Sequence, residues 1–127
     1  MTKILVIEDE INISFVLKTF LNEEGYEVVV AENGTKGLSL LQTQLLPDVI
    51  LLDLKMPGMK GRVVAETIKA NERLKRIPIV IISGSFSNSK DFPPKDAYNA
   101  YITKPFELLE VLEVIKKLTN HRKNIAI

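Results

Sequence analysis

The sequence predicts an α/β fold in which a five-stranded parallel sheet is wound with crossover helices. Two observations predict it. Short apolar runs of strand length alternate along the chain with segments of helical period. Three of these runs are apolar throughout, as is typical of strands that are covered on both faces. The chain has 127 residues, of which 46% are hydrophobic, so it is long enough to form one domain with its own core.

The first half of the chain contains two pairs of a strand and a helix. The first strand is the apolar run 4–7, and the next segment, 12–24, carries apolar side chains at the spacing of one helical face. The second strand is expected at residues 26–31, followed by a helix over residues 35–44. The motif at residues 33–37 lacks the spacing of a Walker phosphate loop, so we interpret it as a turn and a helix cap.

The second half contains three further strands and two clear helices. Residues 49–52 and 79–82 are runs of valine, isoleucine and leucine, and the helical segment 61–70 lies between them. A weaker strand at residues 100–102 precedes a helix over residues 106–118. The alternation of strand and helix is therefore complete except between the fourth and fifth strands.

The segment between the fourth and fifth strands is poor in helix formers. Phe92, Pro93 and Pro94 interrupt it, because a proline lacks the amide donor and biases its predecessor away from helical angles. Proline is favoured at the first helical position, so a short helix can begin at either proline and continue through residues 95–98. The fourth helix is therefore expected to be shortened and displaced, with residues 85–91 as a mobile loop.

The composition excludes several classes of site and of partner. The chain has no cysteine, which excludes disulfides, thiolate metal sites and cysteine nucleophiles, and it has a single histidine. Carboxylates are then the remaining candidate metal ligands. A net charge of +1 is too small for the positive surface of a nucleic-acid-binding protein, and no apolar run is long enough to cross a bilayer. Neither nucleic acid nor a membrane is expected as a direct partner.

The two ends of the chain carry weaker signals. The N-terminus leads straight into the first strand without the features of a secretory signal, so a cytoplasmic location is expected. Residues 1–120 are expected to form the domain, and the chain is expected to be loose after Leu118. Residues 121–127 are then a C-terminal tail or the start of a linker.

Side chains that can carry chemistry follow the predicted strands at the point where each strand ends. They are two acids after the first strand, one acid after the third, a hydroxyl after the fourth and an ammonium after the fifth: Glu8, Asp9, Asp53, Ser83 and Lys104. In an open parallel sheet the ligand site lies beyond the carboxyl ends of the strands. One such residue alone is more simply a helix cap or a solvated charge, but their joint placement at one edge predicts a site.

The predicted cluster has the parts needed to form an acyl phosphate. Clustered carboxylates repel one another, and a hard cation with oxygen ligands, most often Mg²⁺, relieves that repulsion. Asp53 is placed as a nucleophile toward phosphorus, while the metal and Lys104 neutralise the charge of the transferred group. Ser83 can donate a hydrogen bond to a phosphoryl oxygen.

Four motifs carry a resemblance to a known family. They are Val6-Ile7-Glu8-Asp9-Glu10, Asp53-Leu54-Lys55-Met56-Pro57-Gly58-Met59-Lys60-Gly61, Ile82-Ser83-Gly84 and Tyr101-Ile102-Thr103-Lys104-Pro105-Phe106. Over nearly its whole length the chain resembles a receiver domain of two-component response regulators, of the single-domain chemotaxis type. The resemblance implies a doubly wound, flavodoxin-like sheet of order 2-1-3-4-5.

The resemblance also implies roles for the site residues. A histidine kinase or a histidine phosphotransfer protein is expected to phosphorylate Asp53. Mg²⁺ is expected to be held by Asp9, Asp53 and the backbone carbonyl of Lys55, with Glu8 acting through water. Such a domain is a phosphoacceptor that regulates other proteins rather than an enzyme, although it assists its own phosphotransfer and dephosphorylation.

The remaining implications concern the switch and the output. Ser83 and Lys104 are expected to hold the phosphoryl group, and Tyr101 to turn inward when Ser83 moves. The Lys104–Pro105 peptide bond is expected to be cis. Output is expected through the face built by the fourth helix, fifth strand and fifth helix. Its partner is expected to be a downstream protein or effector domain, and partners can include a second copy in a phosphorylation-dependent homodimer.

Two other functions compete with this one. Aspartate-nucleophile phosphatases also place an Asp after a strand, but they carry a second Asp two residues on, where this chain has Lys55. A degenerate receiver would serve only as a binding module, and the retention of every residue of the acid, hydroxyl and lysine set argues against it. The chain departs from the family at Asn99, where glycine is usual, at Lys55 and at Phe92-Pro93-Pro94.

Overall fold

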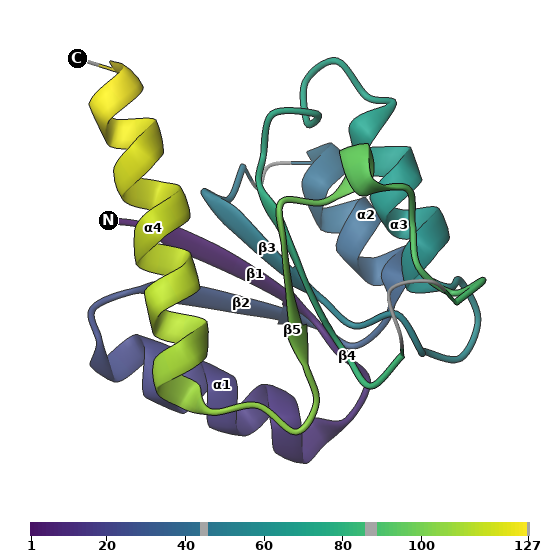
Figure 1. Ribbon diagram of the computed structural model, residues 1–127, viewed down its shortest axis with the longest axis horizontal. Helices are drawn as coiled ribbons and strands as arrows, with labels where there is room; N and C mark the ends of the chain where they lie inside the picture. The colour runs from purple at the N-terminus through teal and green to yellow at the C-terminus, as the bar shows by residue number, and fades with distance from the viewer. Residues whose placement is uncertain (44–45, 86–88, 127) are drawn as a thin grey trace.

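The computed structural model describes residues 1–43, 46–85 and 89–126, with side chains as far as residue 120. Five strands alternate with four α-helices (Figure 1): β1 Lys3–Ile7, α1 Ile11–Glu23, β2 Glu27–Ala31, α2 Gly34–Thr43, β3 Val49–Leu52, α3 Gly61–Lys69, β4 Ile79–Ser83, β5 Ala100–Thr103 and α4 Leu108–Ala126. All strand pairs are parallel, and their order is β2-β1-β3-β4-β5. The predicted doubly wound, flavodoxin-like fold is therefore confirmed.

The helices cover both faces of the sheet. In Figure 1, α1 and α4 lie on one face, and α2 and α3 lie on the other. Alternate residues of each strand point to opposite faces, so Leu5 and Ile7 of β1 belong to one core and Ile4 and Val6 to the other. The strands β3 and β4 are buried over their whole length. This double burial is the reason for their continuous runs of valine, isoleucine and leucine.

The ends of the first two helices follow local signals in the sequence. The side chain of Asn33 accepts a hydrogen bond from the backbone N–H of Lys36 at 2.8 Å, which confirms the interpretation of this motif as a turn and a helix cap. Gly25 follows α1 with a φ of 95°, a left-handed conformation that glycine adopts without strain. The predicted end of the second helix at Gln44 lies outside the described residues.

The fourth helix is reduced to one 3₁₀ turn, η1, at Lys95–Ala97. Pro94 directly precedes the turn, and its carbonyl accepts a hydrogen bond from the N–H of Ala97 at 2.9 Å. The prediction of a shortened helix beginning at the prolines is therefore confirmed. Residues 86–88 of the predicted loop lie outside the described residues.

The last helix differs from the prediction at both ends. It begins at Leu108 rather than at residue 106, and it continues to Ala126. Residues 119–126 contain neither glycine nor proline, and nothing in them ends a helix. Buried Thr119 also donates a hydrogen bond from its hydroxyl to the carbonyl of Ile115 at 2.8 Å. Within the described ranges, no helix is long and apolar enough to span a membrane.

Candidate functional site

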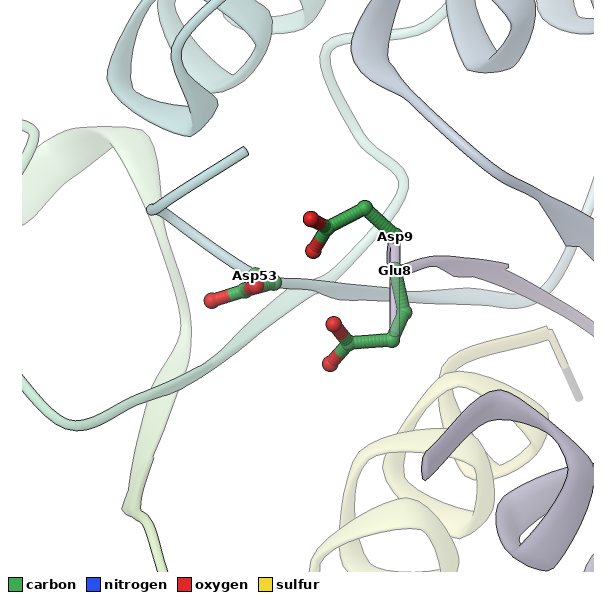
Figure 2. A group of neighbouring side chains, drawn as sticks. All are labelled: Glu8, Asp9 and Asp53. Carbon is green, nitrogen blue, oxygen red and sulfur yellow. The ribbon is translucent and has the colours of Figure 1, made fainter. Parts of the chain in front are cut away.

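Three carboxylates meet at the carboxyl ends of the two central strands. Glu8 and Asp9 follow β1, and Asp53 follows β3. The backbone holds both chain segments in place, because the N–H of Asp53 donates to the carbonyl of Ile7 at 3.0 Å and the N–H of Glu8 donates to Ala31 at 3.0 Å. One oxygen from each carboxylate lies within 4.8 Å of the others (Figure 2). The strand order reverses between β1 and β3, so the cluster lies where open α/β sheets bind ligands.

These carboxylates are largely removed from water. Glu8 is 3% exposed and Asp53 is 4% exposed. Asp9 is only half-buried, but its Oδ1 atom is buried and has no hydrogen-bond partner within the part of the chain that the structure describes. A buried carboxylate oxygen without a donor is costly, so Oδ1 of Asp9 is suited to binding a cation.

Lys104 brings one positive charge to the cluster from the end of β5. Its Nζ lies 3.1 Å from Glu8 Oε1, to which it donates a hydrogen bond, and 3.5 Å from Asp53 Oδ2. Burial lowers the pKa of Lys104, but the negative charges of Asp53 and Glu8 outweigh that effect and raise the pKa above its ordinary value. The lysine is therefore a fixed cation at this site.

One lysine does not balance the charge of three carboxylates, and the pKa of Glu8 is raised as a result. Burial, and after it the negative charge of Asp53, raises the pKa of Glu8 from 4.5 to about 7. A hydrogen bond from the N–H of Glu10 and the Lys104 ammonium lower this pKa, but they do not cancel the increase. The cluster therefore has a deficit of positive charge.

The donor set fits a hard divalent cation. Carboxylate oxygens are the ligands that Mg²⁺ prefers, and Mg²⁺ commonly binds through one or two carboxylates while it keeps several waters. The unpartnered Oδ1 of Asp9 and the raised pKa of Glu8 both indicate that a cation would stabilise the cluster. Within the described ranges, this is the one group of three such side chains close enough to hold a metal ion.

The loop after β3 presents Lys55 at the mouth of the site. The N–H of Lys55 donates to Asp53 Oδ1 at 3.3 Å, and its side chain is exposed. An open cavity of about 380 Å³ lies beside this loop and is lined by Leu54, Lys55, Met56, Lys60 and Asp91. The backbone of Lys55, rather than its side chain, is therefore the part that bonds to the Asp53 carboxylate.

Ser83 reaches the same edge of the sheet as the last residue of β4. It is fully buried, and its Oγ accepts a hydrogen bond from the N–H of Ser85 at 3.1 Å. Its carbonyl accepts a hydrogen bond from the N–H of Lys104 at 2.9 Å, which fixes the neighbouring strand end. This bond uses a lone pair of Oγ and not the hydroxyl proton, so Ser83 can also act as a hydrogen-bond donor.

Tyr101 contacts both Ser85, just after β4, and Phe92, in the segment before η1. The tyrosine hydroxyl donates to the carbonyl of Ser85 at 3.3 Å and accepts from the hydroxyl of Thr103 at 3.0 Å. Its ring meets the buried ring of Phe92 edge to face, with centroids 4.9 Å apart. Phe92 also packs edge to face against Tyr98, with centroids 5.7 Å apart.

The structure divides the predicted residues into two groups. Contacts within one group join the acids and the lysine: Glu8, Asp9, Asp53 and Lys104. Ser83 instead bonds to the backbone N–H of Ser85, and Tyr101 bonds to the backbone carbonyl of Ser85. The Lys104–Pro105 peptide bond is cis, as predicted. Sequence reasoning treated Phe92 only as a helix breaker and missed its packing on Tyr101. An aromatic residue directly before two prolines was the available signal.

Comparison with known proteins agrees with this geometry. The family model of the response regulator receiver domain matches residues 4–116. The chain is 30% identical to sporulation initiation phosphotransferase F of Bacillus subtilis, over 96% of this chain and 97% of that protein. Some other curated relatives are longer, and the chain spans 52% of their length.

Solved structures of receiver domains have the same fold. A CheY-like receiver domain from Methanospirillum hungatei superposes with a TM-score of 0.88 at 26% identity, over 98% of each chain. The response regulator TrrA of Thermotoga maritima, solved in complex with Mg²⁺ and beryllium fluoride, superposes with a TM-score of 0.80 at 35% identity, over 93% of this chain and 99% of that one. The chain therefore belongs to the response regulator receiver domain family.

Proposed function

We propose that this protein is a phosphorylation-dependent signalling switch that accepts a phosphoryl group on Asp53. The observation that carries the proposal is the position of the Asp53 carboxylate, which is buried among two further acids and lies 3.5 Å from the Lys104 ammonium. Receiver domains are the phosphoacceptor domains of two-component systems and interact with histidine kinases and downstream effectors. The donor is therefore a histidine kinase or a histidine phosphotransfer protein.

Mg²⁺ is the proposed cofactor. Asp9, Asp53 and the backbone carbonyl of Lys55 would hold it, with Glu8 acting through water. When bound, the ion neutralises negative charge that develops on the transferred phosphoryl group. The unpartnered Asp9 Oδ1 and the Mg²⁺ in the structure of the Thermotoga relative support this assignment.

The transfer itself is a displacement at phosphorus. A carboxylate oxygen of Asp53 forms a bond to phosphorus while the phosphorus–nitrogen bond of the donor phosphohistidine breaks, and the imidazole nitrogen leaves with the electron pair. Lys104 exchanges its contact with Glu8 for one with a phosphoryl oxygen. Ser83 donates its free hydroxyl proton to another phosphoryl oxygen while its Oγ continues to accept from Ser85. In dephosphorylation, water attacks phosphorus, the bond from phosphorus to the Asp53 carboxylate oxygen breaks, and inorganic phosphate is released.

The output follows from the link between Ser83 and Tyr101. When Ser83 moves toward the phosphoryl group, the Ser85 carbonyl that holds the Tyr101 hydroxyl moves with it. The face that changes is built by η1, β5 and α4, and it binds a downstream protein, an effector domain or a second phosphorylated copy. We place this signalling in the cytoplasm, with no direct contact to nucleic acid.

Intact-protein mass spectrometry tests the proposal. The protein is incubated with acetyl phosphate, with Mg²⁺ or with chelator, beside an Asp53→Asn variant. We expect a phosphorylated species only for the parent protein with Mg²⁺. A species that forms equally in chelator contradicts the metal assignment, and one that survives Asp53→Asn contradicts the acceptor. Failure of the parent to accept phosphate from any donor supports a degenerate receiver instead.

A further inference from the structure

The first residue of α3 lies directly against the backbone that carries the acceptor. A Cβ atom at Gly61 would lie 2.6 Å from Leu54 Cα, and it would also collide with the backbone carbonyl oxygen of Asp53. The N–H of Gly61 donates a hydrogen bond to the Leu54 carbonyl at 3.0 Å. The start of α3 is thus bonded to the Leu54–Lys55 peptide group and packed against the Asp53–Leu54 peptide group, at a distance that leaves no space for a side chain.

The backbone conformation at this position does not itself require glycine. Positive φ angles are found at Gly25 and Gly58, and Gly61 is not among the glycines with positive φ. It is a helical residue, and in a helix alanine is favoured over glycine. The close approach of the two backbones is therefore the reason for glycine at position 61.

Two other helical glycines provide a comparison. A Cβ at Gly34 would meet Val64 Cγ2 at 2.5 Å, and a Cβ at Gly37 would meet Ile7 Cδ1 at 2.6 Å. Both obstacles are ends of side chains, which can rotate or shift. At Gly61 the obstacles are backbone atoms on both sides of the Asp53–Leu54 peptide bond, and they can yield only if the loop itself moves.

We propose that Gly61 is a positioning residue for the phosphoacceptor site. Because Gly61 has no side chain, α3 can pack directly against the Asp53–Leu54 peptide group, and this packing fixes the Asp53 carboxylate and the Lys55 carbonyl relative to each other. This inference rests on the proposed function, because it assigns Gly61 to the geometry of the Mg²⁺ site. The Lys55 N–H already bonds to Asp53 Oδ1 at 3.3 Å, so the loop and the carboxylate form one unit. A methyl group at position 61 would push on the backbone between the Asp53 carboxylate and the Lys55 carbonyl, and would so change their relative position.

Gly61→Ala and Gly34→Ala form a matched pair of variants. Both add one methyl group to a buried glycine in the first turn of a helix, but only Gly61 borders the acceptor backbone. Mg²⁺ affinity is measured by titration calorimetry and thermal stability by circular dichroism. We expect Gly61→Ala to weaken Mg²⁺ binding by about tenfold or more, as is typical when the support of a metal ligand is disturbed. Gly34→Ala should lower thermal stability and leave Mg²⁺ affinity within about twofold of the parent.

The outcomes separate this inference from the proposed function. If the parent binds Mg²⁺ and Gly61→Ala binds it with the same affinity, the positioning role is wrong. A parent protein that does not bind Mg²⁺ contradicts the proposed function itself.

Amide hydrogen exchange of the parent protein covers the case in which Gly61→Ala does not fold. The Gly61 amide should be protected in the metal-free protein, because the bond to Leu54 exists before the ion binds. Exchange at the rate of an exposed loop would overturn the inference.

Discussion

Lys104 Nζ donates a hydrogen bond to Glu8 Oε1 at 3.1 Å, and this contact joins the ends of β5 and β1 across the carboxyl edge of the sheet. The two side chains are 81% and 97% shielded from solvent respectively, so the pair lies in a region of low dielectric. The same ammonium lies 3.5 Å from Asp53 Oδ2. One cation is thus shared by two buried acids of the proposed site.

Replacing this cation should destabilise the metal-free protein. In Lys104→Met, the buried carboxylates lose their positive neighbour, and we expect a loss of about 2 kcal/mol in the free energy of unfolding. The loss is no larger because Glu8 can bind a proton when Lys104 is replaced, which reduces the buried negative charge. Urea unfolding in chelator at neutral pH measures it, with Lys18→Met on the exposed surface of α1 as the control. Equal losses in the two variants would show that the Lys104 contacts contribute no stability.

The raised pKa of Glu8 predicts an unusual dependence of stability on pH. Between the ordinary value of 4.5 and about 7, the folded metal-free protein binds a proton at Glu8 that the unfolded chain releases. This contribution is therefore fully present below pH 4.5 and is lost as the pH rises through about 7. A shift of this size corresponds to a contribution on the order of 3 kcal/mol.

Comparison with Glu8→Gln isolates that contribution from the other titrating groups. Between pH 5 and pH 8 in chelator, the parent should lose stability relative to Glu8→Gln. Saturating Mg²⁺ should remove most of the difference, because the ion stabilises the ionised carboxylate. Parallel stability curves for the two proteins in chelator would contradict the raised pKa.

Phe92 should anchor the segment that replaces the fourth helix without affecting metal binding. In Phe92→Leu, both edge-to-face contacts with tyrosine are lost, and we expect a loss of about 1–2 kcal/mol in stability. Amide exchange at Ala97, whose N–H bonds to Pro94, should become faster. Mg²⁺ affinity should stay within about twofold of the parent.

The control for this variant is Phe15→Leu, because Phe15 is 67% exposed on α1. It should leave both stability and exchange nearly unchanged. If Phe92→Leu behaves like this control, Phe92 does not hold Tyr101 or η1 in place.

The side chain of Lys55 should matter little for the metal. The proposed ligand is its backbone carbonyl, and its backbone N–H makes the bond to Asp53 Oδ1, whereas its ammonium is exposed. Lys55→Ala should therefore bind Mg²⁺ within about twofold of the parent, since exposed charges act weakly through solvent. A larger loss in titration calorimetry would assign the ammonium, rather than the backbone, a role at the site.

Much of the fold and the site could be predicted because the decisive signals are local in sequence. Continuous apolar runs identify strands that are buried on both faces, and the polar residues directly after them identify the edge where Glu8, Asp9 and Asp53 meet. The prolines at 93 and 94 likewise predict the short turn that the structure contains, because their effect on the backbone is local.

Other features depend on contacts that no local pattern encodes. The burial of Phe92 depends on its packing against Tyr98 and Tyr101, and the role inferred for Gly61 depends on the distance between two backbones. The extension of α4 to Ala126 could not be predicted by looking for a stop signal after Leu118, because no glycine or proline follows it.

Chemical mapping of the phosphorylated residue tests the central claim most directly. Borohydride reduces an aspartyl phosphate to homoserine, so peptide mass spectrometry of the parent protein, phosphorylated in Mg²⁺ and then reduced, identifies the acceptor by its position. We predict homoserine at Asp53, and no conversion at Asp9 or in samples treated with chelator. Conversion at Asp9 or another acid, with Asp53 intact, would contradict the assignment of Asp53 as the phosphoacceptor.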